Sequence, residues 1–108
     1  MLGPDIVLAE PPELIATSRS TAAEMRGFVE RAVELVDRVD PRIIVMCSAG
    51  VQTAEDVTAM MALGVGGTGS SSGILRAADP IARMTEMITA MHTAWAELHP
   101  GPAAVTPA

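Results

Sequence analysis

Residues 42–73 decide the fold, and they read RIIVMCSAGVQTAEDVTAMMALGVGGTGSSSG. The apolar run over residues 42–47 shows no alternation, which is typical of a parallel strand covered on both faces. This strand ends in a Ser-Ala-Gly turn at residues 48–50. A weaker strand starts near Val65 and leads into a second turn of glycines and serines that ends at Gly73. The stretch therefore predicts two neighbouring parallel strands, each followed by a turn of small residues.

The two turns are candidates for binding an anion. Ligands of α/β sheets bind at the carboxyl ends of the strands, and small residues let backbone N–H groups approach an anion closely. Two such turns after consecutive strands predict a phosphate cup of the kind that barrels build after their last two strands. The serines at residues 70–72 also fit a flexible linker, but their place between a strand and a helix favours the phosphate interpretation.

Upstream of this stretch, residues 5–9 are a short strand candidate that runs into Glu10-Pro11-Pro12. The prolines end the strand, because they remove hydrogen-bond donors and fix φ. We therefore expect Glu10 at the carboxyl end of this strand, on the same rim as the two turns. From its position alone, Glu10 also fits a solvated surface acid. The following loop, residues 11–20, is long enough to act as a lid.

Three helices are predicted between and after the strands. The first covers about residues 21–38 and begins with a Thr-x-x-Glu capping box. The second begins after the cap Thr53 and ends near Gly64. The third begins with Asp79 as its cap. Its apolar positions step by three and four, and they are Ile81, Met84, Ile88, Met91, Trp95 and Leu98. This stripe favours a core-facing helix over a coiled coil, because it is shorter than three heptads. The alternation of strands and helices predicts an α/β fold with a parallel sheet.

Length and composition narrow the class of protein. At 108 residues the chain holds one small domain, which we place at residues 1–98, followed by a flexible Pro/Ala-rich tail at 99–108. The net charge is −6 and no basic stripe is present, so nucleic acid is not an expected partner. The single cysteine, Cys47, fits a buried strand residue of a cytoplasmic protein. No apolar run suggests a membrane partner, and no spacing of His, Cys or acidic residues suggests a metal or a cofactor.

Six short motifs, which extend up to about Leu98, resemble the C-terminal part of triosephosphate isomerase in order and spacing. The resemblance is closer to the shorter, archaeal-type branch of the family. The motifs are EPPELI at residues 10–15, CSAGV at 47–51, T-x-EDV at 53–57, ALG at 62–64, SG at 72–73 and DP at 79–80. The resemblance implies strands six to eight of a (β/α)8 TIM barrel with their helices. The expected fold is thus a partial TIM barrel of three parallel strands alternating with helices.

The resemblance also assigns roles to individual residues. Glu10 matches the family's catalytic glutamate, the base that moves a proton between two carbons of an enediolate. The lid that closes over the substrate matches Pro11, Pro12, Ala16, Thr17 and Ser18. The backbone N–H groups that hold the substrate phosphate match those of Ala49, Gly50, Ser71, Ser72 and Gly73. These roles make chemical sense, because a carboxylate partly desolvated by a closing loop is a stronger base.

The chain departs from the family pattern at several positions. The family's lid usually ends in Gly-Thr-Gly, whereas residues 16–18 are Ala-Thr-Ser, and the family's first glycine after strand seven is Ser48. Residues 68–70, Thr-Gly-Ser, replace a strand eight that is usually aliphatic. The family's substrate-binding lysine and electrophilic histidine have no counterpart, because the chain has no Lys and its histidines are His92 and His99. A typical complete barrel is roughly twice as long.

Three functional hypotheses follow. The first is an intramolecular oxidoreductase of glycolysis and gluconeogenesis, which interconverts glyceraldehyde 3-phosphate and dihydroxyacetone phosphate, or a similar small sugar phosphate, through Glu10. The second is a non-catalytic phosphate-binding remnant, or a truncated barrel fragment that needs a partner half. The third is another barrel enzyme, a lyase or synthase, that shares only the phosphate cup. We expect a homo-oligomer or a complementary barrel half as the protein partner, because open strand edges favour association.

Overall fold

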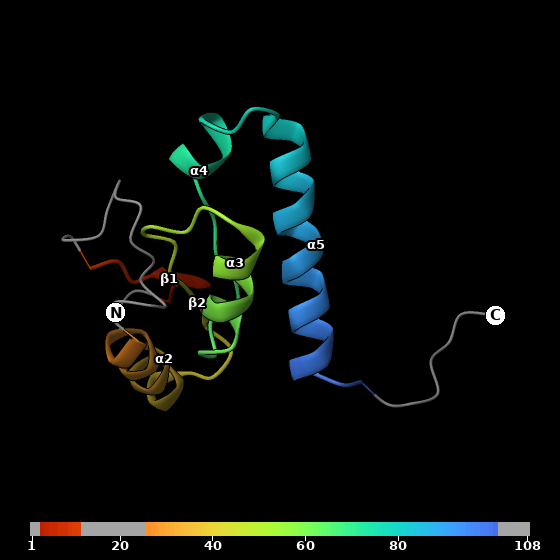
Figure 1. Ribbon diagram of the computed structural model, residues 1–108. Helices are drawn as coiled ribbons and strands as arrows, with labels where there is room; N and C mark the ends of the chain where they lie inside the picture. The colour runs from red at the N-terminus through yellow and green to blue at the C-terminus, as the bar shows by residue number, and fades with distance from the viewer. Residues whose placement is uncertain (1–2, 12–25, 102–108) are drawn as a thin grey trace.

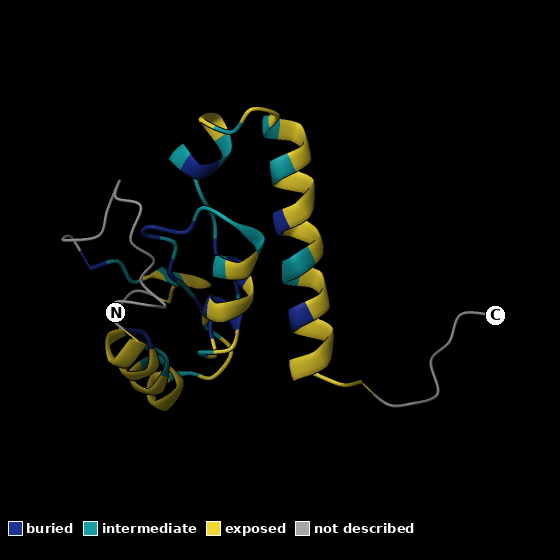
Figure 2. Cartoon of the chain, viewed as in Figure 1, coloured by how far each residue is buried: buried dark blue, intermediate teal, exposed yellow. Residues whose placement is uncertain are grey.

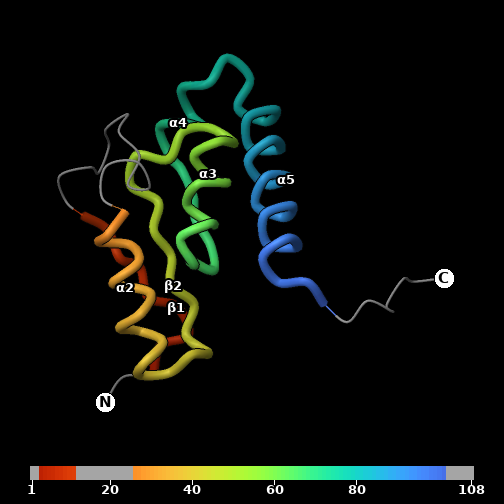
Figure 3. The backbone as a smooth tube through the Cα atoms, turned by 60° about the horizontal axis from the view of Figure 1, so that its bottom comes forward, coloured from red at the N-terminus to blue at the C-terminus, as the bar shows by residue number. Residues whose placement is uncertain are grey.

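The structure is a computed structural model that describes residues 3–11 and 26–101. Its elements follow in the order β1 (Ile6–Leu8), α2 (Arg26–Val39), β2 (Ile44–Met46), α3 (Ala54–Met61), α4 (Ser72–Leu75) and α5 (Pro80–Leu98). The two strands are parallel, and α3 lies between them and α5 (Figures 1 and 3). The chain therefore has the α/β character that its sequence predicts.

The sheet consists of two short strands in register. Ile6 lies opposite Ile44, and Leu8 lies opposite Met46. The predicted third strand, which starts near Val65, is reduced to one isolated parallel bridge between Gly67 and Met46. The structure thus corrects the expected three strands to two strands and one bridge. The physical reason is the glycine content of this segment, because glycines offer no side chains to pack in a strand.

The helix caps lie where the sequence predicts them. At the start of α3, the Asp56 N–H donates to Thr53 Oγ1 at 3.2 Å, and the Asp56 carboxylate accepts the Thr53 N–H at 3.2 Å, which completes a capping box. Gly64 follows α3 in a turn and has φ 99°. At the start of α5, Asp79 Oδ1 accepts the Ala82 N–H at 3.0 Å. Side chains near each start therefore satisfy backbone donors that the helix itself leaves unpaired.

Helix α2 is described from Arg26 to Val39, so the expected capping box at residues 21–24 lies outside the described residues. The helix is followed by Asp40, whose carboxylate accepts hydrogen bonds from the side chain and the backbone N–H of Arg42. These contacts hold the pKa of Asp40 below its ordinary value, the side-chain bond contributing most. The turn leads directly into β2.

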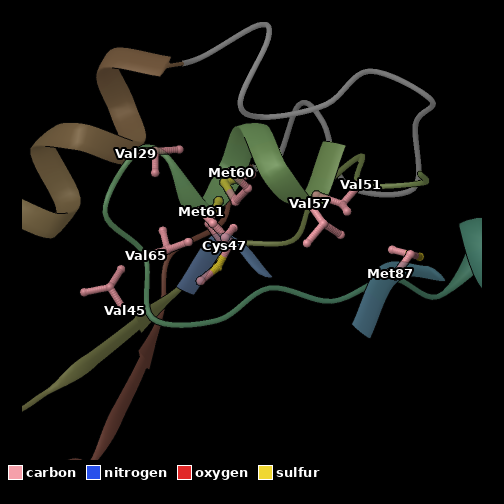
Figure 4. Close-up of a cluster of buried hydrophobic side chains, with 10 residues drawn as sticks. Val29, Val45, Cys47, Val51, Val57, Met60, Met61, Val65 and Met87 are labelled. Carbon is pink, nitrogen blue, oxygen red and sulfur yellow. The ribbon is translucent and has the colours of Figure 1, made fainter. Parts of the chain in front are cut away.

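One hydrophobic core joins the helices to the inner side of the strands. Its buried residues are Val29, Val45, Cys47, Val51, Val57, Met60, Met61, Val65, Met87 and Ala94. Figure 4 shows α3 as the main contributor, with Met60 and Met61 beside Cys47. Both methionines and Cys47 are almost completely buried, as expected for Cys47 from its place in a strand.

The apolar stripe predicted on α5 coincides only in part with the side of the helix that packs on α3. The buried residues of α5 are Met87 and Ala94, whereas Ile81 and Ile88 are 69% and 60% exposed, and most of the outer surface of α5 is exposed in Figure 2. The expectation of a core-facing stripe is therefore wrong for these positions. The packed side of α5 is centred on Met87 and Ala94, one position away from the predicted stripe, and Met91 is the member of the stripe that packs against the core. None of the described helices is both long and apolar enough to cross a membrane.

The sheet has one covered and one open face within the described chain. Side chains alternate along a strand, and Val45 points into the core while its neighbour Ile44 is 44% exposed. On the same face as Ile44, Ile6 and Leu8 are 52% and 63% exposed. An apolar sheet face of this kind is unusual on an isolated soluble domain. This face is thus an apolar surface that the described chain leaves uncovered, and exposed apolar side chains also occur on α5 and on α2, where they include Phe28, Leu35 and Val39.

Candidate functional site

Three segments meet at the carboxyl ends of the strands. The first segment is Glu10, which follows β1. The second is the first turn, which follows β2 and is taken from here on as residues 48–52. The third is the second turn at residues 70–73, the last two of which already lie in α4. The sequence predicts this meeting, because parallel strands bring their carboxyl ends to one edge of the sheet. The strands themselves are only three residues long, so side chains carry much of the connection.

Glu10 is joined to the first turn by two hydrogen bonds from Ser48. The backbone N–H of Ser48 donates to Glu10 Oε1 at 2.8 Å, and the Ser48 hydroxyl donates to the same oxygen at 2.6 Å. Glu10 is half-buried. Ser48 therefore orients the carboxylate on the rim of the sheet. This serine stands where the family pattern has a glycine.

The first turn is buried and tight. Ala49 and Gly50 are both buried, and the Val51 N–H closes the turn by donating to the Ser48 carbonyl at 3.1 Å. Gly50 has φ 76°, a left-handed conformation that strains residues with a side chain. A glycine at this position is thus required by the backbone.

The second turn approaches the first closely. A Cβ atom on Gly73 would lie 2.6 Å from Gln52 Cα and 2.5 Å from Ser70 Oγ. The Ser70 hydroxyl donates to the Val51 carbonyl at 2.6 Å. The absence of a side chain at residue 73 therefore allows the two turns to touch.

A further hydroxyl connects the segments just below the turns. Thr68 is buried, and its Oγ1 donates to the Cys47 carbonyl at 2.8 Å. This bond continues the pairing of Gly67 with Met46 by one more residue. It fixes the start of the second turn against the end of β2.

A cavity of about 300 Å³ opens beside the second turn. Its lining residues are Gln52, Ser72, Gly73, Arg76, Ala77 and Arg83. Arginine supplies the charged groups of this lining, in a chain with a net charge of −6. The cavity is therefore a local site of positive charge that suits an anionic ligand.

The structure brings most of the candidate residues to one edge, but their exposure differs. Ser71 is exposed and makes no side-chain capping bond to α4, Ser72 is half-buried, and Gly73 is buried. Of the expected lid, Pro11 is buried, whereas Pro12, Ala16, Thr17 and Ser18 lie outside the described residues. Within residues 3–11 and 26–101, His, Cys, Asp and Glu side chains form no group of three or more that could hold a metal ion.

Sequence reasoning did not foresee two participants. Ser48 figured only as a departure from the family pattern, although its place at the end of β2, beside Glu10, was a usable signal. Arg83 lies in α5 and reaches the turns through its long side chain, which no local pattern indicates. The histidines do not reach this edge: His92 is exposed toward the far end of α5, and His99 stacks on Trp95 with ring centroids 3.6 Å apart.

The fold defines an α/β unit whose candidate site lies at the carboxyl ends of parallel strands. A chain of the Amycolatopsis orientalis BexX/CysO complex is similar in fold, with a TM-score of 0.66 and 22% identity, over 94% of this chain and 38% of that chain. No family model matches the sequence.

Curated archaeal proteins named triosephosphate isomerase are homologues of this chain. The one from Methanosarcina barkeri is 40% identical over 88 residues, which are 82% of this chain and 40% of the relative. Those from Methanothermus fervidus and Pyrobaculum calidifontis are 39% and 38% identical, over 83% and 80% of this chain and 40% and 38% of the relatives. The resemblance to archaeal triosephosphate isomerases is thus confirmed. The chain spans about 40% of the length of these relatives.

Replacing Gly73 by Ala tests the close contact of the turns. Because the new Cβ would meet the backbone of Gln52 at 2.6 Å, we expect Gly73→Ala to lower the free energy of unfolding by about 1–3 kcal/mol. The matched control is Gly69→Ala, whose Cβ would come no closer than 3.9 Å to its nearest neighbour, on Ser48. Urea unfolding measures both variants, and equal losses would contradict this account of the turns.

Ser48→Ala tests the hydroxyl contact with Glu10. In a double-mutant cycle with Glu10→Gln, we expect a coupling of about 1 kcal/mol in the free energy of unfolding, because the two side chains are bonded directly. The same cycle with Ser71→Ala should be additive to within about 0.5 kcal/mol, since Ser71 is exposed. Additivity in the Ser48 cycle would show that the hydroxyl does not hold the carboxylate.

Proposed function

We propose that this chain forms strands six to eight of a triosephosphate isomerase barrel and takes part in the isomerisation of a small sugar phosphate. The substrates in this proposal are glyceraldehyde 3-phosphate and dihydroxyacetone phosphate, in cytoplasmic glycolysis and gluconeogenesis. The observation that carries the proposal is the convergence of Glu10 and both small-residue turns on one edge of the sheet. The homologues named triosephosphate isomerase support it.

Glu10 is the base in this proposal. Its carboxylate takes a proton from the carbon beside the substrate carbonyl, and the electron pair of that C–H bond forms the C–C double bond of an enediolate as the carbonyl π pair moves onto its oxygen. The proton then returns to the neighbouring carbon while a second proton passes from one substrate oxygen to the other. Ser48 engages Oε1, which leaves Oε2 as the oxygen that accepts the proton. A carboxylate fixed by two donors loses little entropy on reaching the reacting geometry.

The two turns bind the phosphate in the same proposal. The residues that match the family's phosphate-holding turns are Ala49 and Gly50 in the first turn and residues 71–73 in the second. Backbone N–H groups that converge on one point suit a phosphate group. The lid of residues 11–18 closes over the bound substrate and excludes water from Glu10.

Glu10→Gln separates proton transfer from phosphate binding. We expect the variant to lose at least about 100-fold in triose phosphate interconversion, because the amide is not a base, while its affinity for inorganic phosphate stays unchanged. The matched control is Glu30→Gln, on the exposed side of α2, which should keep both properties. A coupled assay and calorimetry measure them, and full activity of Glu10→Gln would end the proposal.

The alternative is a phosphate-binding remnant or a barrel fragment that works only with a partner half. The open sheet face of Ile6, Leu8 and Ile44 favours it, because further strands of a barrel would cover such a face. The lysine and histidine of the family pattern also lack counterparts in this chain. Binding of phosphate without turnover by the purified chain would select this alternative.

Polar substitutions on the open sheet face test whether it is an association surface. We expect the purified chain to self-associate, and the double substitution Ile6→Gln with Leu8→Gln to shift it toward monomer, because burial of these side chains drives association. Leu75→Gln is the control, since Leu75 is similarly exposed but lies on α4. Sedimentation velocity over a range of concentrations measures the oligomeric state of the parent and the variants. A monomeric parent chain would contradict the expectation.

A further inference from the structure

Arg83 reaches from α5 to both turns of the candidate site. Its Nη1 donates to the Gln52 carbonyl at 2.8 Å and lies 3.3 Å from the Gly73 carbonyl, which accepts the second bond. Gln52 ends the first turn and Gly73 ends the second. One guanidinium nitrogen therefore connects the two segments that approach each other most closely.

The environment of Arg83 fits a role in positioning. The side chain is 32% exposed, and its contact with Glu86 on the same helix is long, at 4.0 Å. Its firm partners are thus the two backbone carbonyls. Both accept from a cation, and such charge-assisted bonds are stronger than those between neutral groups.

Arg83 also contributes charge to the cavity beside the second turn. Arg76 is the other cation of that lining, and none of the described residues that line the cavity is acidic. Carbonyl oxygens repel anions, so a cation that binds the carbonyls of the turns reduces this repulsion as it adds attraction. The cavity shares Ser72 and Gly73 with the predicted phosphate cup, so its positive charge lies beside the expected position of a phosphate group.

We propose that Arg83 is a positioning residue, which holds the two turns at the spacing a phosphate group requires and supplies positive charge behind them. The ligand class is a phosphate monoester or inorganic phosphate. The proposal rests on the proposed function for its ligand, but the bridge between the turns can be tested without any ligand.

Arginine is required for this bridge, and lysine is not equivalent. A guanidinium has a planar set of donors that can serve two carbonyls, whereas an ammonium is a compact charge on a flexible stem. Arg83→Lys therefore keeps the charge and weakens the bridge, and Arg83→Met removes both. Arg76→Met removes a charge from the same cavity, and within the described part of the chain this exposed side chain makes no hydrogen bond to the turns.

The first measurement is amide hydrogen exchange of the full chain without ligand. We expect Arg83→Met to exchange about tenfold faster at residues 48–52 and 70–74, Arg83→Lys to be intermediate, and Arg76→Met to match the parent. Val33→Ala, which loosens packing against the core, controls for general destabilisation. It should not accelerate exchange at the turns more than elsewhere in the chain. Unchanged exchange at the turns in Arg83→Met, or the same pattern in Val33→Ala, would overturn the bridge.

The second measurement is the affinity for inorganic phosphate. We expect Arg83→Met to weaken binding about tenfold and Arg83→Lys to recover part of the loss, because charge alone is restored. If the parent binds phosphate and Arg83→Met binds equally well, the role in ligand binding is wrong. If the parent chain itself does not bind phosphate, both the proposed phosphate cup and phosphate as the ligand of Arg83 are wrong. Hydrogen exchange still tests whether Arg83 bridges the two turns.

Discussion

Hydroxyl side chains hold the carboxyl ends of the strands together, and the rest of the site depends on them. The strands are three residues long, so the backbone ladder ends before the functional edge is reached. Beyond that point Ser48 bonds Glu10, Thr68 bonds the Cys47 carbonyl and Ser70 bonds the Val51 carbonyl. Each bond joins segments that are distant in sequence, and together they continue the connection where the strands end.

The range of each contact along the chain explains which features the sequence predicts. Helix starts at Thr53 and Asp79 are local, because a cap and its donor lie within one turn, and both are found as expected. The placement of Glu10 and the two turns follows from the general geometry of parallel strands. The contact of Gly73 with Gln52 required the fold, since only tertiary packing decides how closely two turns approach.

The errors have a common physical origin in tertiary contacts. The apolar stripe of α5 has helical spacing, but spacing does not say which side meets α3, and the structure buries Met87 and Ala94 instead. The third strand was expected from the order of elements, whereas its glycines leave one bridge. The reach of Arg83 to a residue 31 positions away has no local signal at all.

Cys47 gives this chain a chemical reporter of its own. Its side chain is completely buried, it is the single cysteine of the sequence, and it stands where β2 passes into the first turn. A thiol reagent can reach it only when the packing of β2 and α3 around it opens, because a buried thiol is protected from attack. The rate of thiol labelling therefore measures how often the core opens beside the end of β2. The native cysteine serves as the label site, so no residue has to be introduced.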